Sequence, residues 1–295
     1  MVFSINGIIV VNKEQGFTSH DVVAVMRKIL GTKKVGHTGT LDPQATGVLP
    51  ICVGKGTKVS DMLTNSDKEY IAEVTLGLTT DTEDIWGETI QKFDASHITE
   101  AMVNSAVKKF IGEISQIPPM YSAVKIGGKK LYEYARSGVE VERKSRIVNI
   151  NEIEISNFKD GKFNMRVACS KGTYIRTLCS DIGKELGVGA CMSALVRTKS
   201  SVFTLDNAKT LDELKKEAED GNIKSNIIPV DALFSHFPEV NLDSKRTENI
   251  LNGMFLSVQL ADGEYRVYGD SGDFLCIAKV CDGTLKIVKN FYAGK

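Results

Sequence analysis

The chain has 295 residues, of which 42% are hydrophobic, so it can bury a sizeable core and is long enough for one large domain and a small one. Its 37 basic and 37 acidic residues cancel, which excludes a protein that coats polyanions indiscriminately but allows local basic patches. The six cysteines form no CxxC pair and the four histidines are scattered, so the sequence predicts reduced thiols and no metal site.

The start of the chain has neither the charged lead nor the long apolar core of a secretory signal. No apolar run approaches the ~20 residues that a membrane-spanning helix needs. We therefore expect a cytoplasmic protein with no membrane partner.

The first predicted element is a strand, turn and helix unit. Residues 7–13 are a β-rich run that ends in a turn at Gly16. Thr18 or Ser19 then caps a helix that ends at Gly31, because apolar residues recur at helical spacing between these positions.

The next segment, residues 36–50, is a loop rich in Gly, Thr and Pro that carries one carboxylate, Asp42. Its glycines allow positive φ and close approach of a ligand, and Pro43 biases Asp42 to an extended conformation. The apolar residues 48–53 predict a buried strand after it. A lone acid on such a loop fits a nucleophile or a general base, although an Asx turn that only folds the loop is the alternative.

Residues 31–38 nearly match a phosphate-binding P-loop, but His37 stands where that motif requires a lysine. The match also follows a helix instead of a strand, which argues against a nucleoside triphosphatase. His37 is either a loop histidine satisfied by backbone or a flat ring that wedges or stacks against a base.

Beyond the loop, periodicity and turn residues predict the remaining elements. In chain order these are a strand over 68–80 with Tyr70 at its entrance, helices over 99–111 and 130–136, strands over 146–157 and 162–170, a helix over 172–187 capped by Thr173, a charged helix over 209–220, a connector to about 240, and short strands over 263–292 with Asp-Gly turns.

Arg176 lies near the start of the predicted helix over 172–187, where a cation is unfavourable to the helix dipole. A specific anionic partner explains it, and Asp42 is the candidate. A buried Asp paired with a guanidinium stays ionised at neutral pH, as a nucleophile or base must. Three basic clusters also favour an anionic partner for the whole chain: Arg27, Lys28, Lys33 and Lys34; Lys125, Lys129 and Lys130; Arg143, Lys144 and Arg146.

The loop from Gly36 to Pro50 resembles the signature loop of the bacterial TruB-type tRNA pseudouridine-55 synthases, a family of the pseudouridine synthase superfamily. The resemblance covers residues 7–200, and residues 240–295 match loosely the small RNA-binding module of that family. Four further blocks agree in order, at residues 7–16, 67–70, 116–125 and 169–178.

This resemblance implies an α+β fold in which a mixed, largely antiparallel sheet is flanked by helices over residues 1–235, with a small C-terminal β-rich PUA-like domain over 240–295. It implies isomerisation of the uridine at position 55 in the T loop of tRNA to pseudouridine, through base flipping and rearrangement of the glycosidic bond. It implies tRNA as the partner, no cofactor and no metal, and we expect a monomer.

The resemblance also implies roles for nine residues. Asp42 would be the catalytic carboxylate, Arg176 would hold it ionised and oriented, and Tyr70 would stack on the uracil and is the candidate to take the C5 proton. His37 would fill the place of the flipped base. The residues that would bind RNA or substrate are His37, Lys13, Lys125, Tyr174, Ile175 and Leu195, of which Ile175 and Leu195 would be apolar walls.

Two functions from other classes remain as alternatives. One is a tRNA-binding or RNA-folding chaperone that uses the same fold without catalysis, but a binding loop has no need of an acid that faces phosphates. The other is a glycoside hydrolase or nucleosidase, which normally needs two carboxylates across one bond, and the sequence offers only Asp42.

Overall fold

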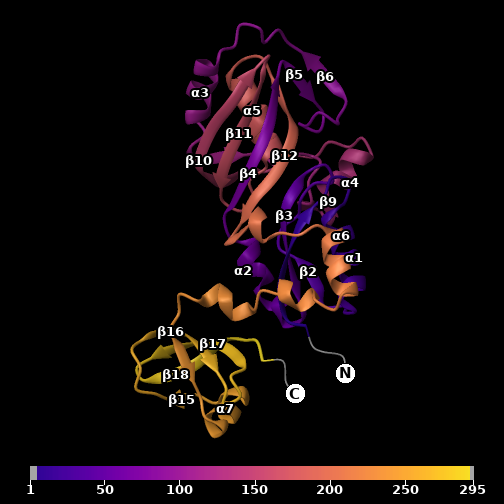
Figure 1. Ribbon diagram of the computed structural model, residues 1–295. Helices are drawn as coiled ribbons and strands as arrows, with labels where there is room; N and C mark the ends of the chain where they lie inside the picture. Colours follow the sequence, from indigo (N-terminus) through magenta and orange to yellow (C-terminus); the bar gives the residue numbers. More distant parts are fainter. Residues whose placement is uncertain (1–4, 293–295) are drawn as a thin grey trace.

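The computed structural model describes residues 5–292, which contain a nine-stranded sheet, a five-stranded sheet and two two-stranded hairpins (Figure 1). The large sheet runs in the order β1-β3-β12-β4-β11-β10-β7, with β2 on β3 and β13 on β12. Its strands are β1 (Gly7–Lys13), β2 (Val35–His37), β3 (Thr46–Val53), β4 (Lys68–Leu76), β7 (Gly112–Gln116), β10 (Arg146–Lys159), β11 (Lys162–Cys169), β12 (Ala190–Ser200) and β13 (Phe203–Thr204).

The large sheet is antiparallel except where β12 meets β3, which confirms the predicted mixed, largely antiparallel sheet flanked by helices. Val196 and Arg197 of β12 pair in parallel with Thr46 and Gly47 of β3. This short junction connects one group of strands (β1, β2 and β3) with the rest of the sheet (β12, β4, β11, β10 and β7).

Helices flank the large sheet, and their bounds follow from local signals. α1 begins after Thr18, which forms a capping box with Asp21, and it ends at Gly31 in the left-handed conformation. The helices are α1 (Ser19–Leu30), α2 (Ser60–Thr64), α3 (Glu100–Lys108), α4 (Leu131–Arg136), α5 (Ile175–Glu185), α6 (Leu211–Glu219) and α7 (Ser244–Leu251), with the 3₁₀ segments η1 (Gly54–Val59), η2 (Leu205–Asn207), η3 (Ile223–Asn226) and η4 (Val230–Phe234).

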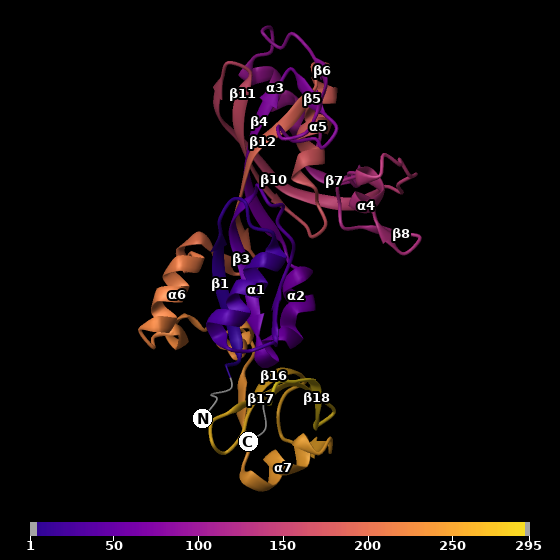
Figure 2. The same cartoon turned by 90° about the vertical axis from the view of Figure 1, so that its right-hand side faces the viewer.

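Two hairpins lie outside the large sheet. One joins β5 (Leu78–Thr80) to β6 (Thr89–Lys92), and the other joins β8 (Lys125–Ile126) to β9 (Lys129–Lys130). The segment with β8 and α4 projects to one side of the molecule, whereas α6 lies on the opposite side, next to β1 (Figure 2).

Three predicted elements differ from the structure. The strand expected over 68–80 ends at Leu76, because Gly77 has φ +80°, and the chain continues as β5 in a separate hairpin. The helix expected from 172 begins at Ile175, since the Thr173 hydroxyl donates to the Ser170 carbonyl and does not cap the helix. The connector expected before 240 is packed, because Ile228 forms a β-bridge with Ile8.

The small sheet has the order β14-β16-β17-β18-β15 and lies at one end of the molecule. Asp282 and Gly283 have φ of 48° and 67°, as a tight hairpin turn between β17 and β18 requires. A buried cluster with Ile8, Phe234 and Ile277 joins the two sheets, so a domain boundary between 235 and 240 stays a prediction. The strands of the small sheet are β14 (Glu239–Asn241), β15 (Leu256–Ser257), β16 (Gly263–Tyr268), β17 (Phe274–Cys281) and β18 (Thr284–Asn290).

All six cysteines are free, and five of them are buried. Within residues 5–292, each helix is too short or too polar to cross a bilayer.

The junction of β3 and β12 depends on Gly47, which has φ +102°. A Cβ at this position would lie 2.3 Å from the carbonyl oxygen of Arg197. We predict that Gly47→Ala lowers the free energy of unfolding by about 2–4 kcal/mol, from backbone strain and overpacking together. Urea unfolding followed by circular dichroism measures this change.

Gly36→Ala is the matched control, because a Cβ at Gly36 meets no atom within 4 Å. Its free energy of unfolding should stay within about 0.5 kcal/mol of the wild type. Equal stabilities of the two variants would contradict the importance of the close contact at Gly47.

Candidate active site

The loop with Asp42 is tied to the turn between β1 and α1. The Leu41 N–H donates to the Ser19 hydroxyl at 2.9 Å, and the Gly16 N–H donates to the Pro43 carbonyl at 2.8 Å. Leu41 and Ala45 are buried in the core beneath the sheet. Asp42 therefore projects from a loop that is fixed on both sides of it.

Lys13 is part of this anchor, and the predicted phosphate contact is wrong. Its side chain is fully buried, and its ammonium donates to the carbonyls of Glu14, Phe17 and Pro43 at 3.0, 2.7 and 3.1 Å. Burial lowers the pKa of Lys13 to about 8, with the Asp42 carboxylate opposing the shift. An ammonium whose three donors are all used inside the protein cannot reach an RNA phosphate.

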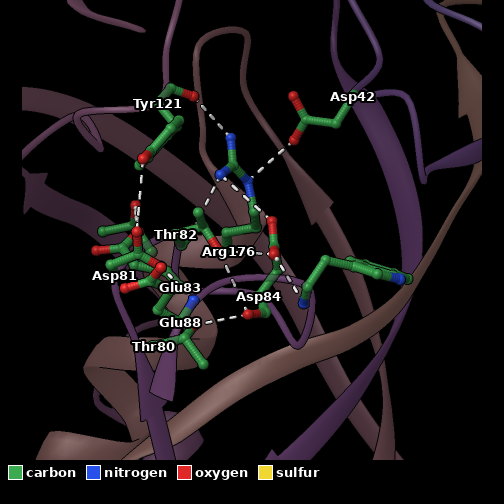
Figure 3. A network of polar contacts seen from close by, with 11 residues as sticks. Asp42, Thr80, Asp81, Thr82, Glu83, Asp84, Glu88, Tyr121 and Arg176 are labelled. Atoms are coloured by element: carbon green, nitrogen blue, oxygen red, sulfur yellow. Dashed lines mark hydrogen bonds and ion pairs between the residues drawn. The ribbon is translucent and has the colours of Figure 1, made fainter. Parts of the chain in front are cut away.

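Arg176 and Asp42 form the predicted ion pair, with Arg176 Nε 2.9 Å from Asp42 Oδ2 (Figure 3). The Arg176 side chain is 5% exposed and that of Asp42 is 42% exposed. The expectation of a buried carboxylate is thus corrected, because the buried member of the pair is the arginine. The Asp42 side chain is therefore accessible to a substrate, while its Oδ2 is bound by the buried guanidinium of Arg176.

The rest of the guanidinium is fixed by groups from two other segments. Nη1 donates to the Thr82 carbonyl and Nη2 to the Tyr121 carbonyl, each at 2.9 Å. Asp84 Oδ2 lies 3.5 Å from Nη1. With acceptors on all three nitrogens, the guanidinium has one orientation, and that orientation directs Nε at Asp42.

Asp84 is a site residue that the sequence did not reveal. Burial raises its pKa, and the Thr82 hydroxyl and the Arg176 guanidinium oppose the shift. Asp84 belongs to an acidic run between β5 and β6, which in a sequence is typical of a solvated turn. Only the position of this turn against α5 gives Asp84 its contact.

Tyr70 lies on β4 opposite Arg197 of β12. Arg197 is 1% exposed, and its guanidinium donates to the carbonyls of Val48 and Gly39 at 2.7 and 3.2 Å. Burial raises the pKa of Tyr70, although Arg197 opposes the shift, so the phenol is neutral at pH 7. Arg197 is not apparent from the sequence, because no strand is predicted over residues 190–200.

Three further predicted residues lie around this cluster. Ile175 and Leu195 belong to the same buried cluster as Leu41, with Tyr70 packed against it. Tyr174 is half-buried, and its ring lies 4.6 Å from the guanidinium carbon of Arg146. Ile175, Leu195 and Tyr70 thus share a core cluster with Leu41 of the Asp42 loop, and Tyr174 lies next to Ile175 at the start of α5.

Lys125 is exposed on β8, within the segment that projects away from the large sheet (Figure 2). The structure does not bring it into the cluster around Asp42. A contact of Lys125 with RNA stays a prediction.

His37 is half-buried and packs edge-to-face on His20, with ring centroids 5.3 Å apart. Its Nδ1 is buried without a hydrogen-bond partner among the described residues. Burial lowers the pKa of His37 to about 4, and His20 and Arg197 add to the shift. The ring is therefore neutral at pH 7, which disfavours acid or base work there. No group of three or more potential metal-binding side chains occurs in residues 5–292.

Acid should destabilise the protein through His37. Its pKa is about 4 in the folded protein against 6.5 for the free side chain. Between these values the unfolded chain takes up a proton that the folded protein excludes, so the contribution of His37 to stability is full above pH 6.5 and is lost as pH falls toward 4. We predict that His37→Gln loses less free energy of unfolding than the wild type between neutral pH and about pH 5. Equal losses in urea unfolding would contradict the low pKa.

Family models and known proteins match the chain over most of its length. A model described as TruB family pseudouridylate synthase (N terminal domain) matches residues 27–175. Models described as tRNA pseudouridylate synthase B C-terminal domain and Pseudouridine synthase II TruB, C-terminal, match residues 176–235 and 238–286.

Curated relatives named tRNA pseudouridine synthase B are similar to this chain. The protein from Bacillus pumilus (strain SAFR-032) is 50% identical over 258 residues, which are 85% of this chain and 84% of that protein. The protein from Alkaliphilus oremlandii (strain OhILAs) is 52% identical over 248 residues, 84% of this chain and 82% of that protein. The protein from Bacillus subtilis (strain 168) is 44% identical over 92% of both chains.

Solved structures share the fold. A chain in the crystal structure of a Cbf5-Nop10-Gar1 complex is 28% identical, with a TM-score of 0.71 over 97% of this chain and 85% of that chain. A chain in the structure of an H/ACA RNP bound to a substrate RNA containing 2'-deoxyuridine is 26% identical, with a TM-score of 0.70 over the same shares. The chain belongs to the TruB family of pseudouridylate synthases.

Proposed function

We propose that this protein converts a uridine in the T loop of tRNA to pseudouridine, with Asp42 as the catalytic carboxylate. The observation that carries the proposal is the ion pair between the exposed carboxylate of Asp42 and the buried guanidinium of Arg176. Membership of the TruB family and relatives named tRNA pseudouridine synthase B support the reaction and the substrate.

The reaction breaks the bond between C1′ of the ribose and N1 of uracil, rotates the base, and joins C1′ to C5. The proton on C5 leaves and N1 gains one, so atoms and electrons balance without an external reagent. Such a rearrangement needs a carboxylate at the ribose and a pocket that retains the free base. Asp42 can attack C1′, add to C6 of the base, or remove the proton on C2′; all three roles use an oxygen that the exposed side chain offers.

We propose that apolar and aromatic side chains line the site that takes the uracil. Ile175 and Leu195 supply apolar surface, and the neutral ring of Tyr70 suits stacking on uracil. A neutral phenol can accept the C5 proton only if it passes its own proton on. We therefore propose stacking as the main role of Tyr70.

The target uridine must leave its stack before a carboxylate reaches C1′, which costs a few kcal/mol. His37 is our candidate for the side chain that fills the vacated place, because it is neutral and lies five residues before Asp42. Lys125, with Arg143 and Lys144, is the candidate for phosphate contacts, whose strength falls with added salt.

Asp42→Asn should abolish pseudouridine formation while tRNA affinity stays within about tenfold, because the amide keeps the shape of the side chain and removes the anion. The measurement is release of tritium from tRNA labelled at C5 of uridine, with binding followed separately. Asp61→Asn, at an exposed position on α2, is the control and should react like the wild type. Turnover by Asp42→Asn would overturn the catalytic role, and an inactive wild type that still binds tRNA would favour the chaperone.

Arg176→Lys should lower kcat by roughly a hundredfold with little change in KM, because one ammonium cannot hold Asp42 and meet the Thr82 and Tyr121 carbonyls together. Steady-state tritium release gives both constants. Wild-type kcat in this variant would mean that the guanidinium does not orient Asp42.

A further inference from the structure

Gln116 makes two hydrogen bonds to one backbone residue at the start of α5. Its side chain is 1% exposed at the end of β7. Its Oε1 accepts from the Tyr174 N–H at 2.8 Å, and its Nε2 donates to the Tyr174 carbonyl at 3.0 Å. Because both polar atoms of the amide bind the same residue, the pair fixes the position and the rotation of the Tyr174 backbone, as a β-bridge does.

Tyr174 is the residue from which α5 begins, and its own side chain makes no capping hydrogen bond in the described structure. Gln116 satisfies its N–H from outside the helix. The next two residues are Ile175, a wall of the proposed pocket, and Arg176. A shift of the helix start would move the guanidinium away from its 2.9 Å contact with Asp42.

The segment that follows Gln116 touches the same helix start a second time. Its Tyr121 carbonyl accepts from Arg176 Nη2 at 2.9 Å. Between the two contacts lie Pro118 and Pro119, which restrict the backbone. Residues 116–121 therefore hold both the backbone at Tyr174 and the guanidinium of Arg176.

Arg146 supports the same arrangement from the neighbouring strand. It is the register partner of Gln116 on β10, and its guanidinium carbon lies 4.6 Å from the centre of the Tyr174 ring. Its buried Nε and Nη2 have no hydrogen-bond partner in residues 5–292. Stacking on Tyr174 is thus the contact that accounts for the buried part of this guanidinium.

We propose that Gln116 is a positioning residue for the reaction: it fixes Tyr174 so that Arg176 holds Asp42 in the reactive orientation. This inference rests on the proposed function for its kinetic consequence. Its structural part, the control of the contact between Arg176 and Asp42, can be tested without any turnover.

The test compares Gln116→Met with the wild type. Methionine fills a similar volume without either hydrogen bond, so kcat for tritium release should fall about 10–100-fold while KM and tRNA affinity stay within about twofold. Gln116→Glu keeps an acceptor for the Tyr174 N–H and should recover part of the loss, and it also serves if the methionine variant folds poorly. Tyr265→Phe is the control, because it removes one largely buried hydrogen bond, to the Ala261 carbonyl, in the small sheet, and its kcat should not change.

Two further measurements separate positioning from general destabilisation. Adding Gln116→Met to Arg176→Lys should change kcat by less than about twofold, because both substitutions act through one guanidinium. The NMR signal of the Arg176 Nε–H, assigned by its loss in Arg176→Lys, should shift or exchange faster with water in Gln116→Met and remain unchanged in Tyr265→Phe.

The outcomes distinguish this inference from the proposed function. An active wild type with unchanged kcat and an unchanged Nε–H signal in Gln116→Met would overturn the inference alone. A kcat loss equal to that of Tyr265→Phe, or full additivity with Arg176→Lys, would also overturn it. An inactive wild type would overturn the proposed function, and the Nε–H signal would then still decide whether Gln116 controls the contact of Arg176 with Asp42.

Discussion

The site depends on one buried cation. The guanidinium of Arg176 is withdrawn from water, and a charge in that position is tolerated only when its donors are met by acceptors in good geometry. Carbonyls from two segments and the carboxylates of Asp42 and Asp84 supply them. Since these acceptors come from three loops, the need to satisfy Arg176 also brings the loops together at the start of α5.

The same principle governs the opposite side of the Asp42 loop. Lys13 and Arg197 are both buried, and both donate to carbonyls of the loop or of the strand that follows it. Basic side chains here act as internal supports of a loop that has little regular hydrogen bonding of its own. A loop held by cations also lies in a positive field, which suits both a reactive carboxylate and an RNA substrate.

Local signals predicted much of the fold. The cap at Thr18, the glycine that ends α1 and the alternation in β4 are properties of neighbouring residues, and these elements appear in the structure, although β4 ends at Leu76 and not at residue 80. β12 was missed, although it lies at the centre of the sheet, because its polar and small residues break the alternation that marks a strand. Its partners, β3 and β4, are more than a hundred residues away, so pairing and not propensity makes it a strand.

The sequence by itself determined the family and the pairing of Asp42 with Arg176, and it makes Asp42 the candidate catalytic carboxylate, because a loop of glycine, threonine and proline around one acid is informative without a structure. Tertiary structure decided which charges are buried. In the folded chain Lys13 binds carbonyls at the Asp42 loop, where the sequence predicted a contact with RNA. Asp42 is exposed, whereas its partner Arg176 is buried. Asp84, Arg197 and Gln116 join the site only through tertiary contacts. The physical reason is that burial and hydrogen-bond partners are set by segments that meet only in the folded chain, and these decide whether a lysine binds a phosphate or a carbonyl.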